Sequence, residues 1–256
     1  MALSWAKRRQ LDYILIVLGF FLVVGSVIYL IYRPVPSCFD GKQNQDEQGI
    51  DCGGVCRLAC TNQVQALKIN WVRPLKVASG WYDLVAQVEN PNPLLGNRNL
   101  PYAFSVYDND NVLITKREGS TFINPGEKFA IFESRVATGD RVVSKAFLEF
   151  PTSTPWENIL PVEKSISIEK RDFVNSPKPV LHLSVQNSSL VTLSNIQVVT
   201  VLSDINNNVF AASQTVVDKL GPGGSQDAYL TWPTPFLSDP SYIDSSWRVN
   251  AFNLSK

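Results

Sequence analysis

Four cysteines carry the densest chemistry in this 256-residue chain, and all of them lie within a stretch of 23 residues, at Cys38, Cys52, Cys56 and Cys60. An even number of cysteines in a segment too small for a hydrophobic core is typical of a disulfide-bonded module in an oxidising compartment. Four thiolates can also hold zinc, but zinc sites favour Cys-x2-Cys pairs, and these spacings are longer. The sequence therefore predicts two disulfides and leaves three connectivities open.

Oxygen-bearing side chains crowd the loop between the first two cysteines. A hard cation such as Ca²⁺ takes about six to eight oxygen ligands from a flexible loop. The spacing is not that of an EF-hand, so a solvated acidic turn is the alternative interpretation. The candidate calcium ligands are Asp40, Asn44, Asp46, Glu47 and Asp51.

Residues for catalysis are scarce. The chain has one histidine, His182, and lacks a Gly-x-Ser-x-Gly elbow, a phosphate-binding glycine loop and a His-Glu-x-x-His zinc motif. Two close carboxylates can hydrolyse glycosides, but the pair Asp108 and Asp110 lies in a polar hairpin turn. The sequence therefore predicts a protein that is not an enzyme and has no catalytic residue and no cofactor, apart from the candidate calcium.

The charge balance excludes one class of partner. Lysine and arginine total 23, aspartate and glutamate also total 23, and the formal net charge is zero. Binding to nucleic acid needs a basic face that neutralises phosphates. We therefore expect no nucleic-acid partner.

A membrane-spanning helix is predicted at residues 13–32, which form a run of 20 residues without a charge. At ~1.5 Å per residue such a helix crosses a ~30 Å hydrocarbon core. Lys7, Arg8 and Arg9 precede the run and Arg33 follows it, so the positive-inside rule places the N-terminus in the cytoplasm and the rest outside the cell or in the periplasm. A cleaved signal peptide is the alternative, although its apolar region is usually shorter.

The remaining sequence repeats itself at an offset of 97 residues. Leu84 corresponds to Leu181 and Asn90 to Asn187, and Pro125-Gly126 corresponds to Pro222-Gly223. Apolar and turn residues that match in the same order indicate a duplicated fold. The predicted organisation is a cytoplasmic tail at 1–12, a transmembrane helix at 13–32, a cysteine-rich acidic module at 33–63 and two domains at 64–160 and 161–256.

Both repeats have the pattern of short strands. Apolar residues alternate with polar ones over four to eight positions, and Asn, Asp, Pro and Gly interrupt the runs. Several such strands in about 100 residues are typical of an antiparallel immunoglobulin- or fibronectin-like sandwich. The sequence therefore predicts a mainly β protein with two tandem β-sandwiches. The expected core aromatics are Trp71, Trp81, Phe104, Phe147, Tyr229, Trp232, Trp247 and Phe252.

Two resemblances accompany these patterns. The run Cys-x-Asp-Gly-x-x-Asn-x-x-Glu-x-Gly-x-Asp-Cys-Gly-Gly-x-Cys from Cys38 resembles a cysteine motif of surface proteins of bacteria and some animals, which implies an extracellular location. Phe104-Ser-Val-Tyr107-Asp108, followed by Asn-Pro-Gly-Glu, resembles the FxLYD domain, a β-sandwich related to late-embryogenesis-abundant-like domains. The second repeat lacks the aromatic pair, and the resemblance implies a fold rather than a ligand.

These features together predict a single-pass, non-catalytic, membrane-anchored surface protein that presents two sandwiches for binding or as a spacer. Loops on a rigid scaffold usually carry recognition, so the expected contact surfaces are 90–99 and 108–111. We expect a protein or envelope-surface partner. The alternatives are an accessory subunit of a membrane or envelope assembly and, less favoured, an envelope hydrolase.

Overall fold

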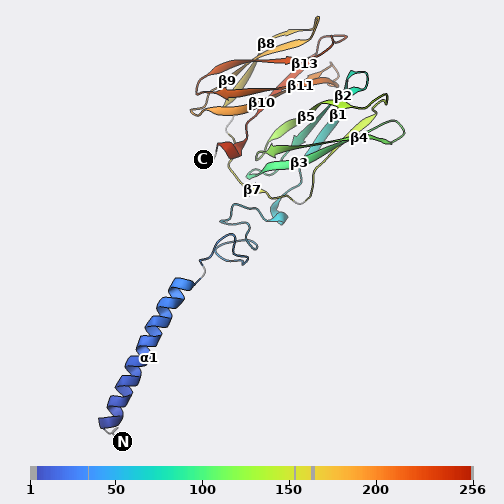
Figure 1. The fold of residues 1–256 in the computed structure, drawn as a ribbon. Coiled ribbons are helices and arrows are strands. Elements are labelled where there is room, and N and C mark those ends of the chain that lie inside the picture. Colours follow the sequence, from blue (N-terminus) through green and yellow to red (C-terminus); the bar gives the residue numbers. More distant parts are fainter. Residues whose placement is uncertain (1–4, 34, 153, 163–164, 255–256) are drawn as a thin grey trace. The chain divides into compact units, whose positions relative to one another are not determined.

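The computed structural model describes residues 5–33, 35–152, 154–162 and 165–254, and the chain forms two compact units, Met1–Val55 and Cys56–Lys256 (Figure 1). The first unit holds the only long helix of the described residues and most of the cysteine-rich segment. The second unit holds the β-strands. The boundary between the units lies inside the segment 33–63 that the sequence suggested as one module.

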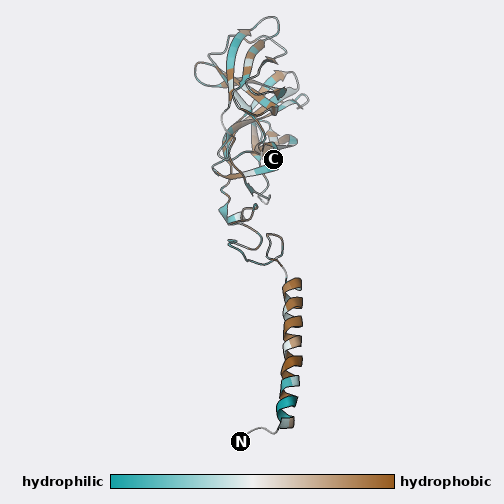
Figure 2. Ribbon diagram, turned by 90° about the vertical axis from the view of Figure 1, so that its left-hand side faces the viewer, coloured by the Kyte–Doolittle hydropathy of each residue, from teal (hydrophilic) through white to brown (hydrophobic). Residues whose placement is uncertain are grey.

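The first unit begins with helix α1, Trp5–Tyr32, which is long and apolar enough to cross a membrane. Its 28 residues span about 42 Å at the usual rise of an α-helix, and none of its side chains is buried. The helix starts before the predicted residue 13, so the basic residues at 7–9 lie on its first turns. Figure 2 shows this polar start and the apolar surface that follows it.

The strands of the second unit form two groups. The first group is β1 (Lys68–Ala78), β2 (Trp81–Glu89), β3 (Leu95–Tyr107), β4 (Leu113–Ile123), β5 (Lys128–Ala137), β6 (Lys145–Glu149) and the short β7 (Glu157–Asn158). The second group is β8 (Ile166–Val174), β9 (Val180–Asn187), β10 (Leu193–Ser203), β11 (Val209–Leu220), β12 (Ser225–Thr231) and β13 (Tyr242–Arg248). The 3-10 helices are η1 (Thr61–Gln63) and η2 (Ala251–Asn253).

Each group is a sandwich of two antiparallel sheets. In the first, the sheet β1-β2-β5 faces the sheet β4-β3-β6, and β7 also pairs with β3. In the second, the sheet β8-β9-β12 faces the sheet β11-β10-β13. Strand for strand, the two orders are the same, which is the topology expected of a duplicated fold. The predicted mainly β architecture with antiparallel sheets is confirmed.

Buried asparagines occupy the same place in both sandwiches. The side-chain amide of Asn90 donates to the carbonyl oxygen of Asn124 at 2.8 Å. Asn187, 97 residues later, donates to the carbonyl oxygen of Gly221 at 3.1 Å. Both asparagines are almost fully buried, with 1% and 0% of their surface exposed. The offset of 97 found in the sequence therefore describes equivalent hydrogen bonds.

The hairpin after the third strand of each sandwich breaks that offset. Asp108 Oδ1 accepts the N–H of Val112, and Asp204 Oδ1 accepts the N–H of Asn208. These equivalent turns lie 96 residues apart rather than 97. The single ungapped alignment is therefore wrong here by one residue, because the second sandwich is one residue shorter before this turn.

The two cores consist mainly of aliphatic side chains from facing sheets. Phe104, Trp232 and Phe252 are buried as expected. The prediction is wrong for three other aromatic residues, because 46% of the surface of Trp81, 49% of that of Phe147 and 54% of that of Tyr229 is exposed. Alternation in a strand identifies two faces, but it does not say which face an aromatic side chain occupies.

Candidate functional site

The cysteines form disulfides rather than a zinc site. Cys38, Cys52, Cys56 and Cys60 are all disulfide-bonded, and the described chain has no free cysteine. A sulfur in a disulfide is not available as a thiolate ligand, so the zinc alternative is wrong. The two disulfides stabilise a segment that has no hydrophobic core of its own.

Four of the five candidate calcium ligands belong to one hydrogen-bond network. The Asp51 carboxylate accepts the main-chain N–H groups of Asp40 and Gly41. The Asn44 amide donates to Asp40 at 2.7 Å, and this bond is the main reason that the pKa of Asp40 lies below its ordinary value.

Glu47 completes this network by accepting the N–H groups of Asn44 and Asp51, each at 3.3 Å. Asp46 is exposed and makes no side-chain hydrogen bond to the other four among the described residues. The loop is therefore closed by its own main-chain amides, and calcium remains a candidate that would have to share these oxygens.

The side chains of His182 and Asp108, considered above for catalysis, make contacts that stabilise the fold. His182 stacks on Tyr229 with ring centroids 4.7 Å apart. Asp108 accepts two main-chain N–H groups of its own turn and pairs with Arg141, and the bond from Val112 is the main cause of its lowered pKa. A carboxylate engaged in this way stabilises the hairpin.

Three asparagines of the predicted contact loop at 90–99 belong to the interior. Asn90, Asn92 and Asn97 are buried, with 1%, 2% and 3% of their surface exposed, and all three use their side chains to bond main-chain groups. Their role is to hold the loop rather than to contact a partner. That expectation is therefore wrong for these residues.

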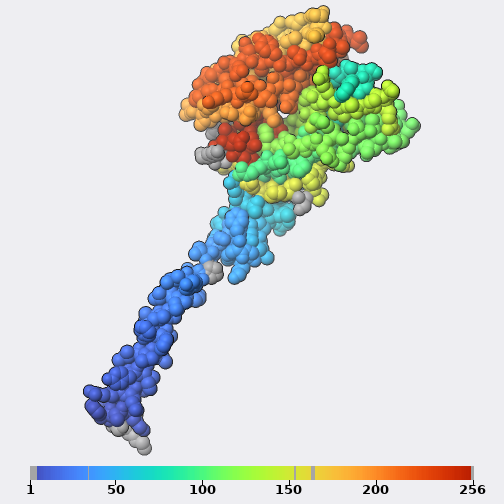
Figure 3. Space-filling view, viewed as in Figure 1, coloured from blue at the N-terminus to red at the C-terminus, as the bar shows by residue number. Residues whose placement is uncertain are grey.

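The two sandwiches pack directly against each other within the second unit. Leu75 of β1, Val85 of β2 and Ala212 of β11 form a buried apolar cluster, joined by partly buried neighbours that include Phe132 and Val201. These side chains lie on the outer faces of the sheets β1-β2-β5 and β11-β10-β13. In Figure 3 the green surface atoms of the first sandwich adjoin the orange surface atoms of the second.

Arg248 contributes a polar contact to the same interface. Its guanidinium binds both carboxylate oxygens of Glu127, at 2.9 and 3.0 Å, and lies over the ring of Phe129 at 3.9 Å. The Asn124 amide adds a bond to the carbonyl oxygen of Val249 at 2.9 Å. Only 3% of Arg248 is exposed, so the charge is compensated inside the interface.

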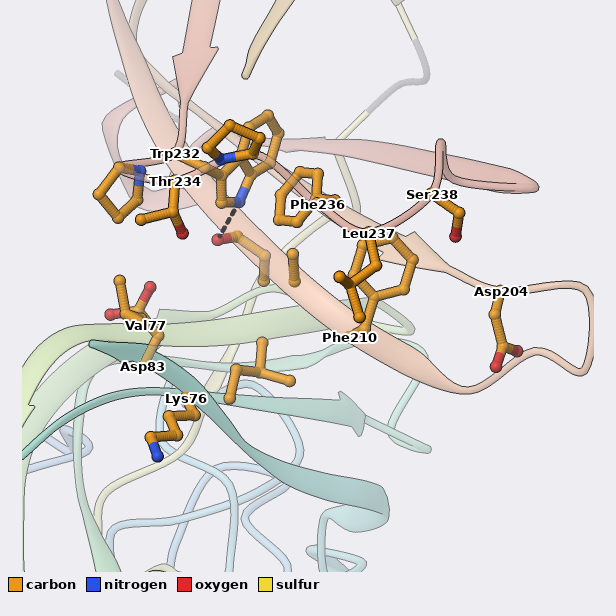
Figure 4. Close-up of a pocket in the computed structure, with 15 residues that line it drawn as sticks. Lys76, Val77, Asp83, Asp204, Phe210, Trp232, Thr234, Phe236, Leu237 and Ser238 are labelled. Carbon is orange, nitrogen blue, oxygen red and sulfur yellow. Dashed lines mark hydrogen bonds between the residues drawn. The ribbon is translucent and has the colours of Figure 1, made fainter. Parts of the chain in front are cut away.

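A cavity of about 430 Å³ opens beside this interface, and we call it the inter-sandwich cleft (Figure 4). Strands β1 and β2 contribute residues 75–77 and Asp83, and the second sandwich contributes Asp204, residues 210–212 and the segment 232–238. Ligand pockets of proteins commonly have volumes of roughly 300–1,000 Å³ and mostly apolar walls. The cleft has this size and composition.

Aromatic side chains form the wall on the side of the second sandwich. The ring of Phe236 contacts that of Phe210 edge-to-face at 5.2 Å and that of Trp232 at 5.6 Å. Trp232 is fixed by donating from Nε1 to the carbonyl oxygen of Ala212 at 3.0 Å. Leu237 is fully exposed at the opening. The aromatic wall is therefore preformed, and one exposed apolar side chain lies at its rim.

Asp83 is the buried charge on the opposite wall. Only 9% of its surface is exposed, and burial raises its pKa above the ordinary value, against the opposing effects of the Arg135 N–H and the Arg135 charge. Its Oδ1 accepts that N–H at 2.9 Å. In Figure 4 the carboxylate points toward segment 232–238, whereas the side chain of Lys76 points the other way.

The sequence did not reveal the cleft, the buried Asp83 that lines it, or the buried Arg248 elsewhere in the sandwich interface. Asp83 stands among apolar and aromatic neighbours in Trp81-Tyr-Asp-Leu-Val, whereas Arg248 follows Asp244-Ser-Ser-Trp and carries no such signal. A charge on a strand whose other residues are apolar indicates that both faces are covered. That signal was present, but it does not identify which surface covers the strand.

Comparisons with known proteins add little to this geometry. No family model matches the chain, and no curated protein matches it. The crystal structure of red sea bream transglutaminase is similar over 73% of this chain, with 17% sequence identity and a TM-score of 0.24. The similarity spans 31% of that structure's own length. A likeness this weak carries no argument about activity.

Proposed function

We propose that this chain is a membrane-anchored binding protein that receives its partner in the inter-sandwich cleft. Helix α1 is its single membrane-spanning segment, the N-terminus is cytoplasmic, and the sandwiches are extracellular or periplasmic. The protein acts by binding and not by catalysis. A protein or another component of the envelope surface is the expected partner.

Two observations support the anchor and its orientation. From Tyr13 to Tyr32 helix α1 carries no charge and buries no side chain. The positive-inside rule places the basic residues 7–9 before this run in the cytoplasm. The disulfide-bonded cysteines follow the helix, and disulfides persist in oxidising compartments. The resemblance of the cysteine run to a motif of surface proteins agrees with this location.

The single observation that carries the binding function is the cleft itself. Both sandwiches contribute to it, and the cluster around Val85 holds them together beside it. The contacts of Arg248 hold them together at the other end of the interface. A preformed cavity avoids much of the ordering cost of binding. A spacer does not require a cavity with aromatic walls and an exposed leucine at its opening.

The test compares the detergent-solubilised full-length protein with two variants in a pull-down quantified by mass spectrometry. Leu237→Asp places a charge at the opening of the cleft. Leu190→Asp makes the same change at a leucine that is 93% exposed and does not line the cleft. We expect a specific partner to be retained by wild type and Leu190→Asp and lost by Leu237→Asp.

The same experiment separates the alternative function. An accessory subunit that binds through α1 and the cysteine-rich segment would retain its partner in all three proteins. Retention by Leu237→Asp would therefore contradict the cleft as the binding site and favour an assembly subunit.

A further inference from the structure

We propose that Asp83 binds a positively charged group, an ammonium or guanidinium carried on an apolar body, inside the inter-sandwich cleft. The inference rests on the proposed function, because it names the chemistry of the ligand that the cleft receives.

The Asp83 carboxylate has an oxygen available to the cleft. Oδ1 accepts the N–H of Arg135 at 2.9 Å, and the described residues provide no further hydrogen bond and no ion pair to Asp83. Lys76 also lines the cleft but points away from the carboxylate (Figure 4). Asp204 uses its carboxylate for its own turn. The charge of Arg135 acts on Asp83 but forms no ion pair with it among the described residues, so a ligand cation would provide the contact ion pair.

The main chain opposite Asp83 is shaped to hold this carboxylate in place. The pairing of β2 with β5 shifts register between Tyr82 and Leu84, and Arg135 has a left-handed backbone with φ of 56°. Such a conformation is unusual for a residue other than glycine. The bond from the Arg135 N–H to Asp83 therefore stabilises a β-bulge and fixes the orientation of the carboxylate.

The aromatic wall suits the same ligand. Phe210, Trp232 and Phe236 form an edge-to-face cluster across the cleft from Asp83 (Figure 4). Aromatic faces attract cations, and their surfaces bury the apolar part of a ligand. A carboxylate on one wall and aromatic rings on the other complement a group with a cationic head and an apolar body.

The surroundings of Asp83 are unfavourable without a ligand. Burial raises the pKa of this carboxyl group, which means that the folded protein disfavours its charged form. Perturbed ionisable groups in clefts are enriched at functional sites. The ion pair with a ligand would compensate for this desolvation.

The first test titrates the full-length protein in nonionic detergent with 2-phenylethylammonium, and with 2-phenylethanol as the neutral analogue of the same shape. Calorimetry should show saturable binding of the ammonium, at least tenfold tighter than the alcohol. Asp83→Asn should weaken ammonium binding at least tenfold, because it removes the charge while Oδ1 still accepts the Arg135 N–H. Asp110→Asn is the matched control, since Asp110 is exposed and lies outside the cleft.

A second arm uses a short acetylated and amidated peptide, Phe-Lys-Phe, to distinguish a protein side chain from a free amine. Tighter binding of the peptide assigns the cation to a partner protein, and tighter binding of the amine assigns it to a small molecule. Sensitivity of either to Asp83→Asn supports the site. Equal binding of ammonium and alcohol, equal binding by wild type and Asp83→Asn, or no saturable binding of either cation would overturn it.

Failure of this inference is distinguishable from failure of the proposed function. A partner that is lost by Leu237→Asp but retained by Asp83→Asn overturns the cation site and leaves the cleft as the binding surface. If a cation binds at Asp83 but the partner is still captured by Leu237→Asp, the cation site stands and the cleft is overturned as the surface that binds the partner. Thermal unfolding of each variant verifies that it is folded.

Discussion

Arg248 of the second sandwich and Glu127 of the first form a two-point ion pair across their interface, with N–O distances of 2.9 and 3.0 Å. The guanidinium is buried against the ring of Phe129 and also donates to the hydroxyl of Thr121. A planar guanidinium matches a carboxylate in this geometry better than an ammonium does. The pair therefore fixes one orientation of the two sandwiches, and the inter-sandwich cleft depends on that orientation.

Replacing Arg248 with methionine should destabilise the second unit, because Glu127 would stay mostly buried without its partner. Breaking a buried ion pair in this way typically costs about 3–5 kcal/mol. Urea unfolding of the full-length protein, followed by tryptophan fluorescence, measures the change. Arg171→Met removes an exposed pair with Glu169 and should cost less than about 1 kcal/mol. Equal effects of the two changes would contradict a special role for Arg248.

Gly119 lies where a side chain would strike a hydrogen bond inside the first sandwich. A Cβ atom there would come within 2.5 Å of the Tyr102 hydroxyl oxygen and 2.8 Å of Glu133 Oε1, which are bonded at 2.7 Å. Gly119→Ala should therefore destabilise the protein by about 1–3 kcal/mol through overpacking. Gly221→Ala, where no atom lies within 4 Å of the new Cβ, is the control in the same urea experiment. If Gly119→Ala leaves the free energy of unfolding unchanged, the Tyr102 and Glu133 side chains can move aside without cost.

Asp83→Asn should stabilise the protein near neutral pH in the absence of ligand. The folded-state pKa of Asp83 is raised above its unfolded value, so ionised Asp83 destabilises the fold at any pH above that raised pKa. As the pH falls through it, the folded wild type takes up a proton before the unfolded chain does, and the difference between wild type and variant should shrink. Urea midpoints measured across this range check the sign. A gap that widens as the pH falls would contradict a desolvated Asp83.

The calcium hypothesis makes a separate prediction for the cysteine-rich segment. If Asp51 and its neighbours bind the ion, calcium should raise the melting temperature of the full-length protein relative to a chelator. Asp51→Asn should abolish the rise, and Asp110→Asn should leave it intact. An unchanged melting temperature of the wild type would leave the solvated, amide-bonded turn as the sufficient account of these carboxylates.

Much of the fold could be predicted because the signals were local or periodic. The uncharged run at 13–32 and the alternating strands needed no knowledge of distant contacts. The correspondence of Asn90 with Asn187 was visible as an offset, and the structure shows that both bond the main chain of an equivalent turn. The one-residue slip at Asp204 was invisible, because similar polar turns match almost equally well at neighbouring offsets.

The candidate site could not be predicted, because it arises where two domains meet. The apolar neighbours of Asp83 indicate that its strand is covered on both faces, but nothing local indicates which sheet covers the face with Asp83 and Val85. Nor does anything local indicate that Arg248 reaches a glutamate 121 positions earlier in the chain. The exposed loop at 90–99 was favoured because polar residues usually mark surfaces. Asn90, Asn92 and Asn97 are instead buried, since an amide side chain can satisfy main-chain groups that a turn leaves unpaired.

Binding in the inter-sandwich cleft can be tested by site-specific photocrosslinking in intact cells, with a benzophenone amino acid at position 237 at the opening of the cleft. The same substitution at position 190 is the control on the second sandwich. We expect a discrete crosslinked product from position 237 that is absent from position 190. No product at position 237, or the same products at both positions, would contradict the claim that the cleft receives a partner.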